Sequence, residues 1–251
     1  MTEFTRGPDG TPIAYESLGE GEPILLIHGF ASSRRINWRA TGWYDFLTRA
    51  GRRVIAMDCR GHGESGKPRD KRDYDETLML GDAVAVLDAS GVKAADVMGY
   101  SMGGYITLRL AHEAPRSVRR LILGGVGGKY FNYWESRSDA MAEALLAPDP
   151  SALTDATQRL FRAFAEKSGN DMAALAACMR RDRRIYSCEE LHGFVPSVLV
   201  VCGENDDIGG PAEDIARCFA HARAVVIPKR DHMQTVGDPK YKEAVAAFLA
   251  T

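Results

Sequence analysis

The residue of this sequence best suited to chemistry is a serine in a glycine-rich turn. Ser101 has Gly99 two positions before it and Gly103 two positions after it, between an apolar run at residues 94–98 and apolar residues at helical spacing from 105 to 111. At a sharp strand-to-helix turn, glycine leaves room for strand and helix to approach closely, and the strained turn pushes the central hydroxyl outward. The context predicts a serine nucleophile; the alternative is a glycine-rich turn with an incidental serine.

A serine hydroxyl is a weak nucleophile, so it needs a base that is itself oriented by a carboxylate. In a strand–turn–helix arrangement of this kind, the acid and then the histidine follow the serine in the chain. His232 comes soon after a predicted strand at residues 224–227, which places it at the carboxyl edge of a parallel sheet, where ligands bind. His221 precedes the same strand and is expected at the opposite edge. We therefore predict that His232 is the base.

The predicted acid lies in a turn after another strand. The apolar run at residues 198–201 leads through Gly203 to Asp206 and Asp207. This turn brings both carboxylates to the same carboxyl edge of the sheet as His232. The register of the turn favours Asp206 as the acid, with Asp207 as the alternative. If it is not the acid, Asp207 is expected to be a capping or loop carboxylate.

Acyl transfer also needs hydrogen-bond donors for the developing oxyanion, each worth about 3 kcal/mol in favourable cases. The backbone N–H of Met102 is one candidate, because it follows the nucleophile directly and begins a helix. The second is expected in the loop after the strand that ends at His28 and Gly29, where the N–H of Phe30 is best placed. His28 is predicted to brace this loop, and it is disfavoured as the base because it precedes the serine.

Alternating strands and helices would bring these residues together. A turn at residues 7–10 separates two short extended segments and predicts an N-terminal hairpin. Continuous apolar runs are typical of strands buried on both faces of a parallel sheet, and here they alternate with helical patterns. The runs lie at residues 23–27, 54–57, 94–98, 118–123, 198–201 and 224–227, and the helices near residues 43–50, 78–87, 102–111, 212–219 and 241–249. The pattern predicts an α/β fold with a mainly parallel sheet and helices on both faces.

The alternation stops between residues 127 and 192, where only helical patterns occur. Because strands resume afterwards, we interpret residues 127–192 as a helical cap inserted into a core of residues 1–126 and 193–251. This segment has more aromatic surface than its own core needs, from Tyr130, Phe131, Tyr133, Trp134, Phe161 and Phe164. Of these, Tyr130, Trp134 and Phe164 are our candidates for lining a substrate pocket, with core packing as the alternative for each. The arginine-rich run at residues 180–184 indicates a solvated face with mixed ion pairs, and contact with an anionic substrate is the alternative.

Composition excludes several classes of protein. The 251 residues suit one sizeable α/β domain, and a formal net charge of −2 gives no reason to expect nucleic acid or an anionic membrane as a partner. The sequence has no C-x-x-C pair, no closely spaced histidine pair and no apolar run of membrane-spanning length. The five cysteines are odd in number and the N-terminus has no secretory h-region, so we expect reduced thiols and a cytoplasmic protein.

Taken together, these motifs resemble those of the α/β-hydrolase superfamily. The resembling segments are His28-Gly29-Phe30, Asp58-Cys59-Arg60-Gly61-His62-Gly63-Glu64-Ser65, Gly99-Tyr100-Ser101-Met102-Gly103-Gly104, Gly203-Glu204-Asn205-Asp206 and His232. They occur in the family's order in both halves of the predicted core. The resemblance implies the α/β-hydrolase fold, a Ser101–Asp206–His232 triad, an oxyanion hole formed by Phe30 and Met102, and a lid formed by the insertion. It implies a structural role for the loop that contains His62, which is not expected to be catalytic.

The expected activity is that of a serine hydrolase, a carboxylesterase that cleaves small apolar esters through an acyl-enzyme on Ser101. Its partners would be the ester and water, with no nucleic acid, membrane, metal or organic cofactor, and the sequence leaves the oligomeric state open. Hydrolases of lactones, thioesters or carbon–carbon bonds could use the same triad. A ligand receptor on the same scaffold is the non-enzyme alternative, since a fold does not fix a function.

Overall fold

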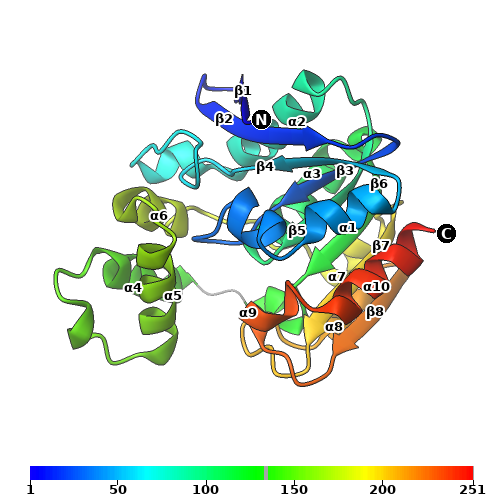
Figure 1. Cartoon of the computed structure of the whole chain (residues 1–251). Coiled ribbons are helices and arrows are strands. Elements are labelled where there is room, and N and C mark those ends of the chain that lie inside the picture. Colours follow the sequence, from blue (N-terminus) through cyan, green and yellow to red (C-terminus); the bar gives the residue numbers. More distant parts are fainter. Residues whose placement is uncertain (133–134, 251) are drawn as a thin grey trace.

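The computed structural model describes residues 1–132 and 135–250 and is organised around one eight-stranded sheet (Figure 1). The strands follow the order β1-β2-β4-β3-β5-β6-β7-β8 across the sheet. They are β1 (Glu3–Arg6), β2 (Pro12–Leu18), β3 (Glu22–Ile27), β4 (Arg52–Met57), β5 (Ala95–Tyr100), β6 (Val118–Gly124), β7 (Ser197–Gly203) and β8 (Ala222–Ile227). Every strand expected from an apolar run is present, and the predicted fold class is confirmed.

Strand pairing is antiparallel at one edge of the sheet and parallel elsewhere. β1 pairs with β2, and β2 with β4, in antiparallel register, which confirms the hairpin predicted around residues 7–10. The other neighbouring strands run parallel. Ile27 at the end of β3 pairs with both Met57 and Gly99, and Gly99 pairs with Leu123. The loops that follow these strands therefore leave the sheet at the same edge.

Side chains of the parallel strands alternate between two apolar cores, one on each face of the sheet. In β3, Leu25 and Ile27 belong to the first core, Ile24 and Leu26 to the second, and all four are fully buried. Strands that are apolar on both faces need helices on both sides. The first core includes side chains of α2 (Glu76–Ala89), α3 (Met102–Glu113) and α8 (Ala212–Ala216), and the second includes side chains of α1 (Trp43–Arg49) and α10 (Pro239–Leu249).

The described chain between β6 and β7 is helical. It contains η4 (Gly128–Asn132), α4 (Glu135–Leu146), η5 (Pro150–Ala152), α5 (Ala156–Lys167), α6 (Met172–Met179) and α7 (Cys188–His192). Helix α4 contacts both α5 and α6, and these three helices stand to one side of the sheet, at the left in Figure 1. Leu191 of α7 belongs to the first core. The sequence does not predict α7, because five residues are too few to show a helical period.

Short helical segments also occur in the connections between the main elements. They are the π-helix η1 (Arg35–Arg39), the 3₁₀ segments η2 (Lys71–Tyr74) and η3 (Pro115–Ser117), and α9 (His232–Thr235). α9 matters for function because the histidine predicted as the base is its first residue.

Polar contacts fasten the helical segment to the loops after β3 and β4. Asn170, between α5 and α6, donates its side-chain N–H to the main-chain oxygen of Ala31 at 2.7 Å and accepts a hydrogen bond from the N–H of Gly63 at 3.3 Å. Arg69 forms an ion pair with Asp171 at 2.7 Å, but Arg69 is exposed, so water and salt screen this pair. The hydrogen bonds of Asn170 thus join this segment to both loops, while apolar side chains of α6 such as Leu175 pack into the first core.

One expectation from the sequence is wrong, because two of the five cysteines are not free thiols. Cys188 and Cys218 form a disulfide, whereas Cys59, Cys178 and Cys202 are free and buried. An odd number of cysteines excludes complete pairing but not a single bridge, and a separation of 30 residues gives no sign that the two segments meet. Disulfides are unusual in the cytosol, so the cysteines no longer favour a cytoplasmic location.

The sequence contains no apolar run of membrane-spanning length, and the helices of the structure can be compared with this. No helix within residues 1–132 and 135–250 is long and apolar enough to cross a bilayer.

Candidate active site

Ser101 lies where β5 ends and α3 begins, with the strained backbone that its glycine neighbours predict. Its φ and ψ are 50° and −113°, a conformation that few residues other than glycine adopt. A Cβ on Gly99 would overlap the main-chain oxygen of Gly103, and a Cβ on Gly103 would overlap the main-chain oxygen of Ile27. The two glycines therefore let α3 pack directly against the ends of β3 and β5, with Ser101 at the turn between them.

A histidine and a carboxylate from the last part of the chain meet near this turn. Nδ1 of His232 lies 2.9 Å from both carboxylate oxygens of Asp206, in the turn after β7. Oδ1 of Asp206 also accepts hydrogen bonds from the N–H groups of Ile208 at 3.0 Å and Gly209 at 2.6 Å. The Tyr100 hydroxyl donates to the main-chain oxygen of His232 at 2.5 Å. Because Nδ1 is bound to the carboxylate, Nε2 is the ring nitrogen left for a nucleophile or a substrate.

Burial and hydrogen bonding have opposite effects on the carboxyl of Asp206. The side chain is almost fully enclosed, and burial alone would raise its pKa. The hydrogen bond and charge of His232, together with the N–H groups of Ile208 and Gly209, outweigh burial and hold the pKa below its ordinary value. Asp206 is therefore ionised at neutral pH. In that state it fixes the Nδ1–H tautomer of His232 and stabilises an imidazolium.

The neighbouring Asp207 has a different environment. Its side chain is exposed, and its main-chain oxygen accepts a hydrogen bond from the ammonium group of Lys129. The carboxylate that pairs with His232 is that of Asp206, at 2.9 Å. Of the two aspartates that the sequence left open, the geometry brings Asp206 to the histidine.

Two cavities meet at Ser101. The first has a volume of about 180 Å³ and includes His232 in its wall. The second has a volume of about 210 Å³ and includes Met102. Phe30, Ser101 and Phe161 line both cavities, and the two phenyl rings lie 6.1 Å apart between centroids. Each cavity is smaller than the roughly 300–1,000 Å³ of sites for drug-sized ligands. The arrangement suits a small molecule that extends to both sides of Ser101.

The two predicted oxyanion donors lie in the loops beside the nucleophile. Met102 is the first residue of α3, where a backbone N–H has no acceptor within its own helix. Phe30 lies in a turn closed by a hydrogen bond from the N–H of Ser32 to the oxygen of Gly29 at 3.3 Å, in which Ala31 has a φ of 57°. Within residues 1–132 and 135–250, neither Phe30 nor Met102 donates its N–H to another turn or loop residue. These two N–H groups can therefore serve an oxyanion.

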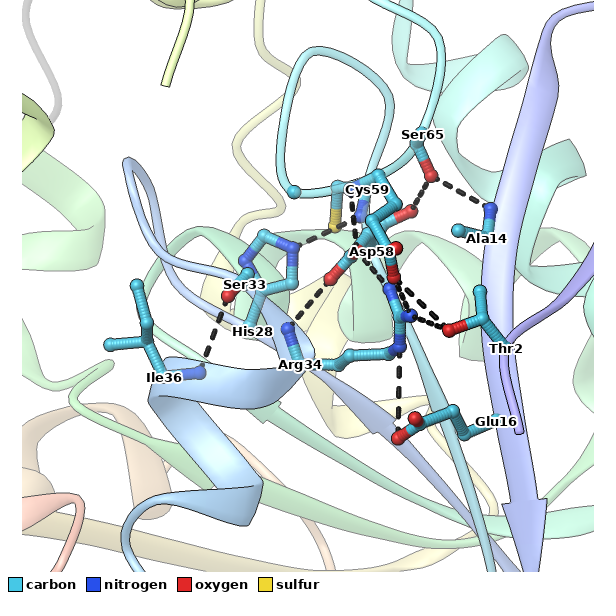
Figure 2. A network of polar contacts seen from close by, with 12 residues as sticks. Thr2, Ala14, Glu16, His28, Ser33, Arg34, Ile36, Asp58, Cys59 and Ser65 are labelled. Carbon is cyan, nitrogen blue, oxygen red and sulfur yellow. Dashed lines mark hydrogen bonds and ion pairs between the residues drawn. The ribbon is translucent and has the colours of Figure 1, made fainter. Parts of the chain in front are cut away.

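Side chains on both flanks hold the turn that contains Phe30. Oδ1 of Asn37 accepts the N–H of Gly29 at 3.0 Å. Nε2 of His28 accepts the N–H of Cys59 at 3.0 Å, and Nδ1 lies 2.7 Å from the oxygen of Gly29 (Figure 2). Burial lowers the pKa of His28, so its ring is neutral and can use one nitrogen as donor and the other as acceptor. His28 thus braces the loop after β3 against the loop after β4, as the sequence predicted.

A buried ion-pair network joins the same two loops (Figure 2). The guanidinium of Arg34 is fully buried and pairs with the carboxylates of Asp58 and Glu64. Asp58 also accepts the N–H groups of Arg34 at 2.7 Å and Glu64 at 2.8 Å. A buried cation is tolerated when it is paired and hydrogen-bonded in this way. The sequence does not single out Arg34, because the adjacent Arg35 is of the same type and is exposed.

The aromatic residues predicted to line the pocket differ in where the structure places them. Phe164 of α5 lines the first cavity. Tyr130 lines neither cavity: it is buried, and its hydroxyl accepts the N–H of Tyr186 at 2.8 Å, so this prediction is corrected and the residue belongs to the core. Trp134 lies outside the described residues. Phe161, another aromatic residue of the insertion, lines both cavities, and its spacing from Phe164 places the two on one helix face.

His62 is fully buried and lies outside both cavities. Its Nδ1 lies 2.9 Å from the main-chain oxygen of Arg60, and burial lowers its pKa well below the ordinary value. This environment agrees with the structural role expected for its loop. In the described ranges 1–132 and 135–250, no group of three or more His, Cys, Asp or Glu side chains could hold a metal ion.

Comparison with known proteins connects this geometry to a family. A family model described as the alpha/beta hydrolase fold matches residues 22–177. The chain belongs to this family. The matched region of this α/β-hydrolase begins at β3, contains the Ser101 turn and extends into α6.

Curated relatives of this α/β-hydrolase include enzymes of more than one kind. The dihydrolipoyllysine-residue acetyltransferase component of an acetoin cleaving system from Pseudomonas putida is 32% identical over 251 residues, which cover 94% of this chain and 65% of that protein. A 2-hydroxymuconate semialdehyde hydrolase from Pseudomonas putida is 42% identical over 113 residues, which cover 45% of this chain and 39% of that protein. The matches thus span less than two thirds of the length of these relatives.

Solved structures are similar to this α/β-hydrolase over its whole length. A hydrolase from Pseudomonas aeruginosa superposes with a TM-score of 0.82 at 25% identity, covering 100% of this chain and 98% of the other. An esterase from Exiguobacterium antarcticum superposes with a TM-score of 0.81 at 24% identity, covering 100% of both chains. The likeness to the esterase shows a shared fold.

Proposed function

We propose that this α/β-hydrolase is a carboxylesterase that cleaves small esters through an acyl-enzyme on Ser101. One observation carries the proposal: His232, which is hydrogen-bonded to Asp206, lines a cavity that is also lined by Ser101. The hydrolases among its relatives and structural neighbours support hydrolysis as the reaction.

The proposed chemistry has two halves. Nε2 of His232 accepts the proton of the Ser101 hydroxyl as Oγ bonds to the ester carbonyl carbon. The carbonyl oxygen becomes an oxyanion and accepts hydrogen bonds from the N–H groups of Phe30 and Met102. His232 returns the proton to the leaving oxygen when the C–O bond breaks, while Asp206 stabilises the imidazolium. A water molecule then attacks the acyl-enzyme with the same base, which releases the acid and restores Ser101.

The two cavities assign a side to each part of the substrate. His232 must reach the leaving oxygen, so we assign the alcohol part to the first cavity, where His232, Met233 and Val236 form part of the wall. The acyl part then extends into the second cavity, past Met102 and Tyr105. The first cavity is lined mainly by apolar groups and suits a small apolar alcohol.

We also propose that residues 127–192 form a cap over this site, on a core of residues 1–126 and 193–251. Phe164 of α5 lines the first cavity, which supports this role. Phe164→Ala should change the preference for alcohol chain length more than it changes the melting temperature. Leu160→Ala is the matched control, because Leu160 lies on the same helix, is 46% exposed and lines neither cavity. An unchanged preference with a large loss of stability would make Phe164 a packing residue only.

A panel of alkyl and p-nitrophenyl esters of graded length, assayed beside lactones and thioesters, tests the reaction class. We expect turnover of short esters by the wild-type protein and a loss of about three orders of magnitude or more in Ser101→Ala. Turnover of lactones or thioesters without turnover of any ester would contradict the carboxylesterase proposal. Binding without turnover of any compound would favour a receptor.

Hydrolysis of a carbon–carbon bond is the second candidate. It is favoured by the 42% identity to a 2-hydroxymuconate semialdehyde hydrolase, although the match covers 45% of this chain. The same nucleophile and base could serve both reactions, so a vinylogous diketone belongs in the same panel. A higher kcat/KM for the diketone than for any ester would favour this candidate.

A further inference from the structure

Ser101 and His232 come from different parts of the fold, so their relative position depends on contacts between those parts. Ser101 follows β5, whereas His232 begins α9, 132 positions after Tyr100. Proton transfer needs Nε2 of the base within hydrogen-bond distance of Oγ, and a displacement of about 1 Å can cost about 10²-fold in rate. The proposed function, on which this inference rests, therefore requires a contact that fixes α9 relative to β5.

The chain that carries His232 is held to the turn that carries Asp206. The N–H of Asn205 donates to the main-chain oxygen of Arg230 at 2.9 Å, and Nδ1 of His232 lies 2.9 Å from the carboxylate of Asp206. The acid and the base thus belong to one structural unit, formed by the loops after β7 and β8. These contacts do not determine how far this unit lies from the turn at Ser101.

Helix α9 is too short to define its own place in the fold. It has four residues, and a helix of this length has little stability without tertiary contacts. The side chain of its cap, Asp231, accepts the N–H groups of Met233 at 2.9 Å and Gln234 at 2.8 Å. These two bonds close the first turn of the helix. The position of α9 relative to β5 is left to contacts with other elements.

Tyr100 makes such a contact from the side of the nucleophile. It is the last residue of β5 and directly precedes Ser101. Its hydroxyl donates to the main-chain oxygen of His232 at 2.5 Å, and its ring lies 5.4 Å from the imidazole between centroids. Burial raises the pKa of Tyr100 well above its ordinary value, so the hydroxyl keeps its proton and remains a donor. One side chain therefore joins the residue beside the nucleophile to both the main chain and the ring of the base.

Gly125, in the loop after β6, packs against both of these rings. A Cβ at this position would lie 2.8 Å from Cε1 of His232 and 3.1 Å from Cζ of Tyr100. The N–H of Gly125 donates to the main-chain oxygen of Val201 at 2.8 Å, which ties the loop to β7. The imidazole thus has the carboxylate of Asp206 at Nδ1 and Gly125 beside Cε1. Nε2 is left for the nucleophile.

We propose that the hydroxyl of Tyr100 is a positioning group that sets the distance between Ser101 and its base. The ring of Tyr100 belongs to the second core and is 4% exposed, so phenylalanine would fill the same space. A buried hydroxyl needs a hydrogen-bond partner, and here the partner is the main chain of His232. Without this bond, α9 keeps its contacts with the Asp206 turn but loses its hydrogen bond to the strand of the nucleophile. The acid–base pair then shifts relative to Oγ, and proton transfer slows.

Tyr100→Phe tests this role, because it removes the hydroxyl and keeps the ring. It should lower kcat/KM for p-nitrophenyl acetate by about tenfold to a hundredfold, and the rate of labelling by a fluorophosphonate by a similar factor. Both reactions need the base beside the nucleophile. In a His232→Ala background, Tyr100→Phe should change either rate by no more than about twofold, since the hydroxyl acts through the base.

Tyr74→Phe is the matched control. Tyr74 is fully buried, its hydroxyl donates to the main-chain oxygen of Pro68 at 2.6 Å, and it lines neither cavity at Ser101. This variant also loses a buried hydrogen bond, yet it should keep kcat/KM within about twofold of the wild-type value. Melting temperatures give the cost of each substitution to stability, and the rates are compared at a temperature where every variant is folded.

Two results would overturn the inference and leave the proposed function intact. One is a kcat/KM of Tyr100→Phe equal to that of Tyr74→Phe while the wild-type protein hydrolyses the ester. The other is a loss on Tyr100→Phe that is as large in the His232→Ala background as in the wild-type protein. A wild-type protein that neither hydrolyses the ester nor reacts with the fluorophosphonate would overturn both the inference and the proposed function.

Discussion

Asp206 and Asp207 are adjacent in the chain, yet the carboxylate that pairs with His232 is that of Asp206. Asp206→Asn should lower kcat by up to about four orders of magnitude in a folded protein, because an amide favours the wrong tautomer and cannot stabilise the imidazolium. Asp207→Asn should cost no more than about tenfold, since its exposed carboxylate contributes at most about 0.5–2 kcal/mol, and to stability. Ester turnover at one pH near neutrality measures the difference. An inactive Asp207 variant beside an active Asp206 variant would reverse the assignment.

The lowered pKa of Asp206 also predicts how stability depends on pH. Folding favours the ionised carboxylate, so its contribution is present above the ordinary pKa of about 3.9 and is lost as pH falls through the lower folded-state value. The free energy of unfolding of wild-type protein should therefore exceed that of Asp206→Asn most clearly above about pH 5, and the difference should shrink below about pH 4. Urea denaturation of both proteins across this range measures it. A difference that grows steadily toward pH 3 would refute the direction of the shift.

Site residues are predictable from the sequence where short-range geometry fixes them. Ser101, Asp206 and His232 each follow a predicted strand by a few residues, so a parallel sheet brings them to one edge whatever the details of packing. Tyr130 is not predictable in this way, because the packing of neighbouring helices decides whether an aromatic ring lines a cavity or the core. The burial of Arg34 cannot be predicted from the sequence for a related reason: only the tertiary structure distinguishes a buried arginine from an exposed one.

At the level of elements, the turn at Ser101 depends on α3 approaching the end of β3. Gly103→Ala should lower the free energy of unfolding by about 2 kcal/mol or more and reduce turnover, because its Cβ would overlap the main-chain oxygen of Ile27. Gly193→Ala is the matched control: this glycine has a φ of −75°, and its Cβ would lie 3.4 Å from its nearest neighbour. It should change stability by no more than about 1 kcal/mol. Equal effects of the two substitutions in urea denaturation would contradict the packing described for Gly103.

The strands are the elements that the sequence predicts best. Their apolar runs are continuous because both faces of a parallel strand are buried, and β-branched residues such as valine and isoleucine recur in them, whereas the apolar run of α6 is rich in alanine. Short helices such as α7 and the π-helix η1 have too few residues to show a period, and tertiary contacts decide whether they form.

At the scale of the whole molecule, the sequence predicts the helical segment between β6 and β7 but not how it meets the core. Asn170 contacts the loop that contains Ala31, 139 positions away, and the loop that contains Gly63, 107 positions away. Contacts over such separations leave no local pattern. The disulfide between Cys188 and Cys218 cannot be predicted from the sequence for the same reason. The two cysteines come together only when α7 packs beside the chain after α8.

This disulfide gives a prediction for the oxidised protein. Thiol titration under denaturing conditions should find three free thiols, those of Cys59, Cys178 and Cys202. Reduction should lower the free energy of unfolding by about 3–4 kcal/mol, the loop-closure contribution for a separation of 30 residues. Cys188→Ser is the control, because reductant should not change its melting temperature. Five titratable thiols in protein purified without reductant would contradict the bridge.

Covalent labelling with a fluorophosphonate probe, located by peptide mass spectrometry, tests whether Ser101 is the nucleophile. We expect one phosphonyl group per chain, attached to Ser101, and loss of ester turnover in step with labelling. His232→Ala should react far more slowly, because the hydroxyl loses its base. A folded wild-type protein that stays unlabelled, that is labelled at another residue, or that keeps its turnover with Ser101 fully modified would contradict Ser101 as the nucleophile.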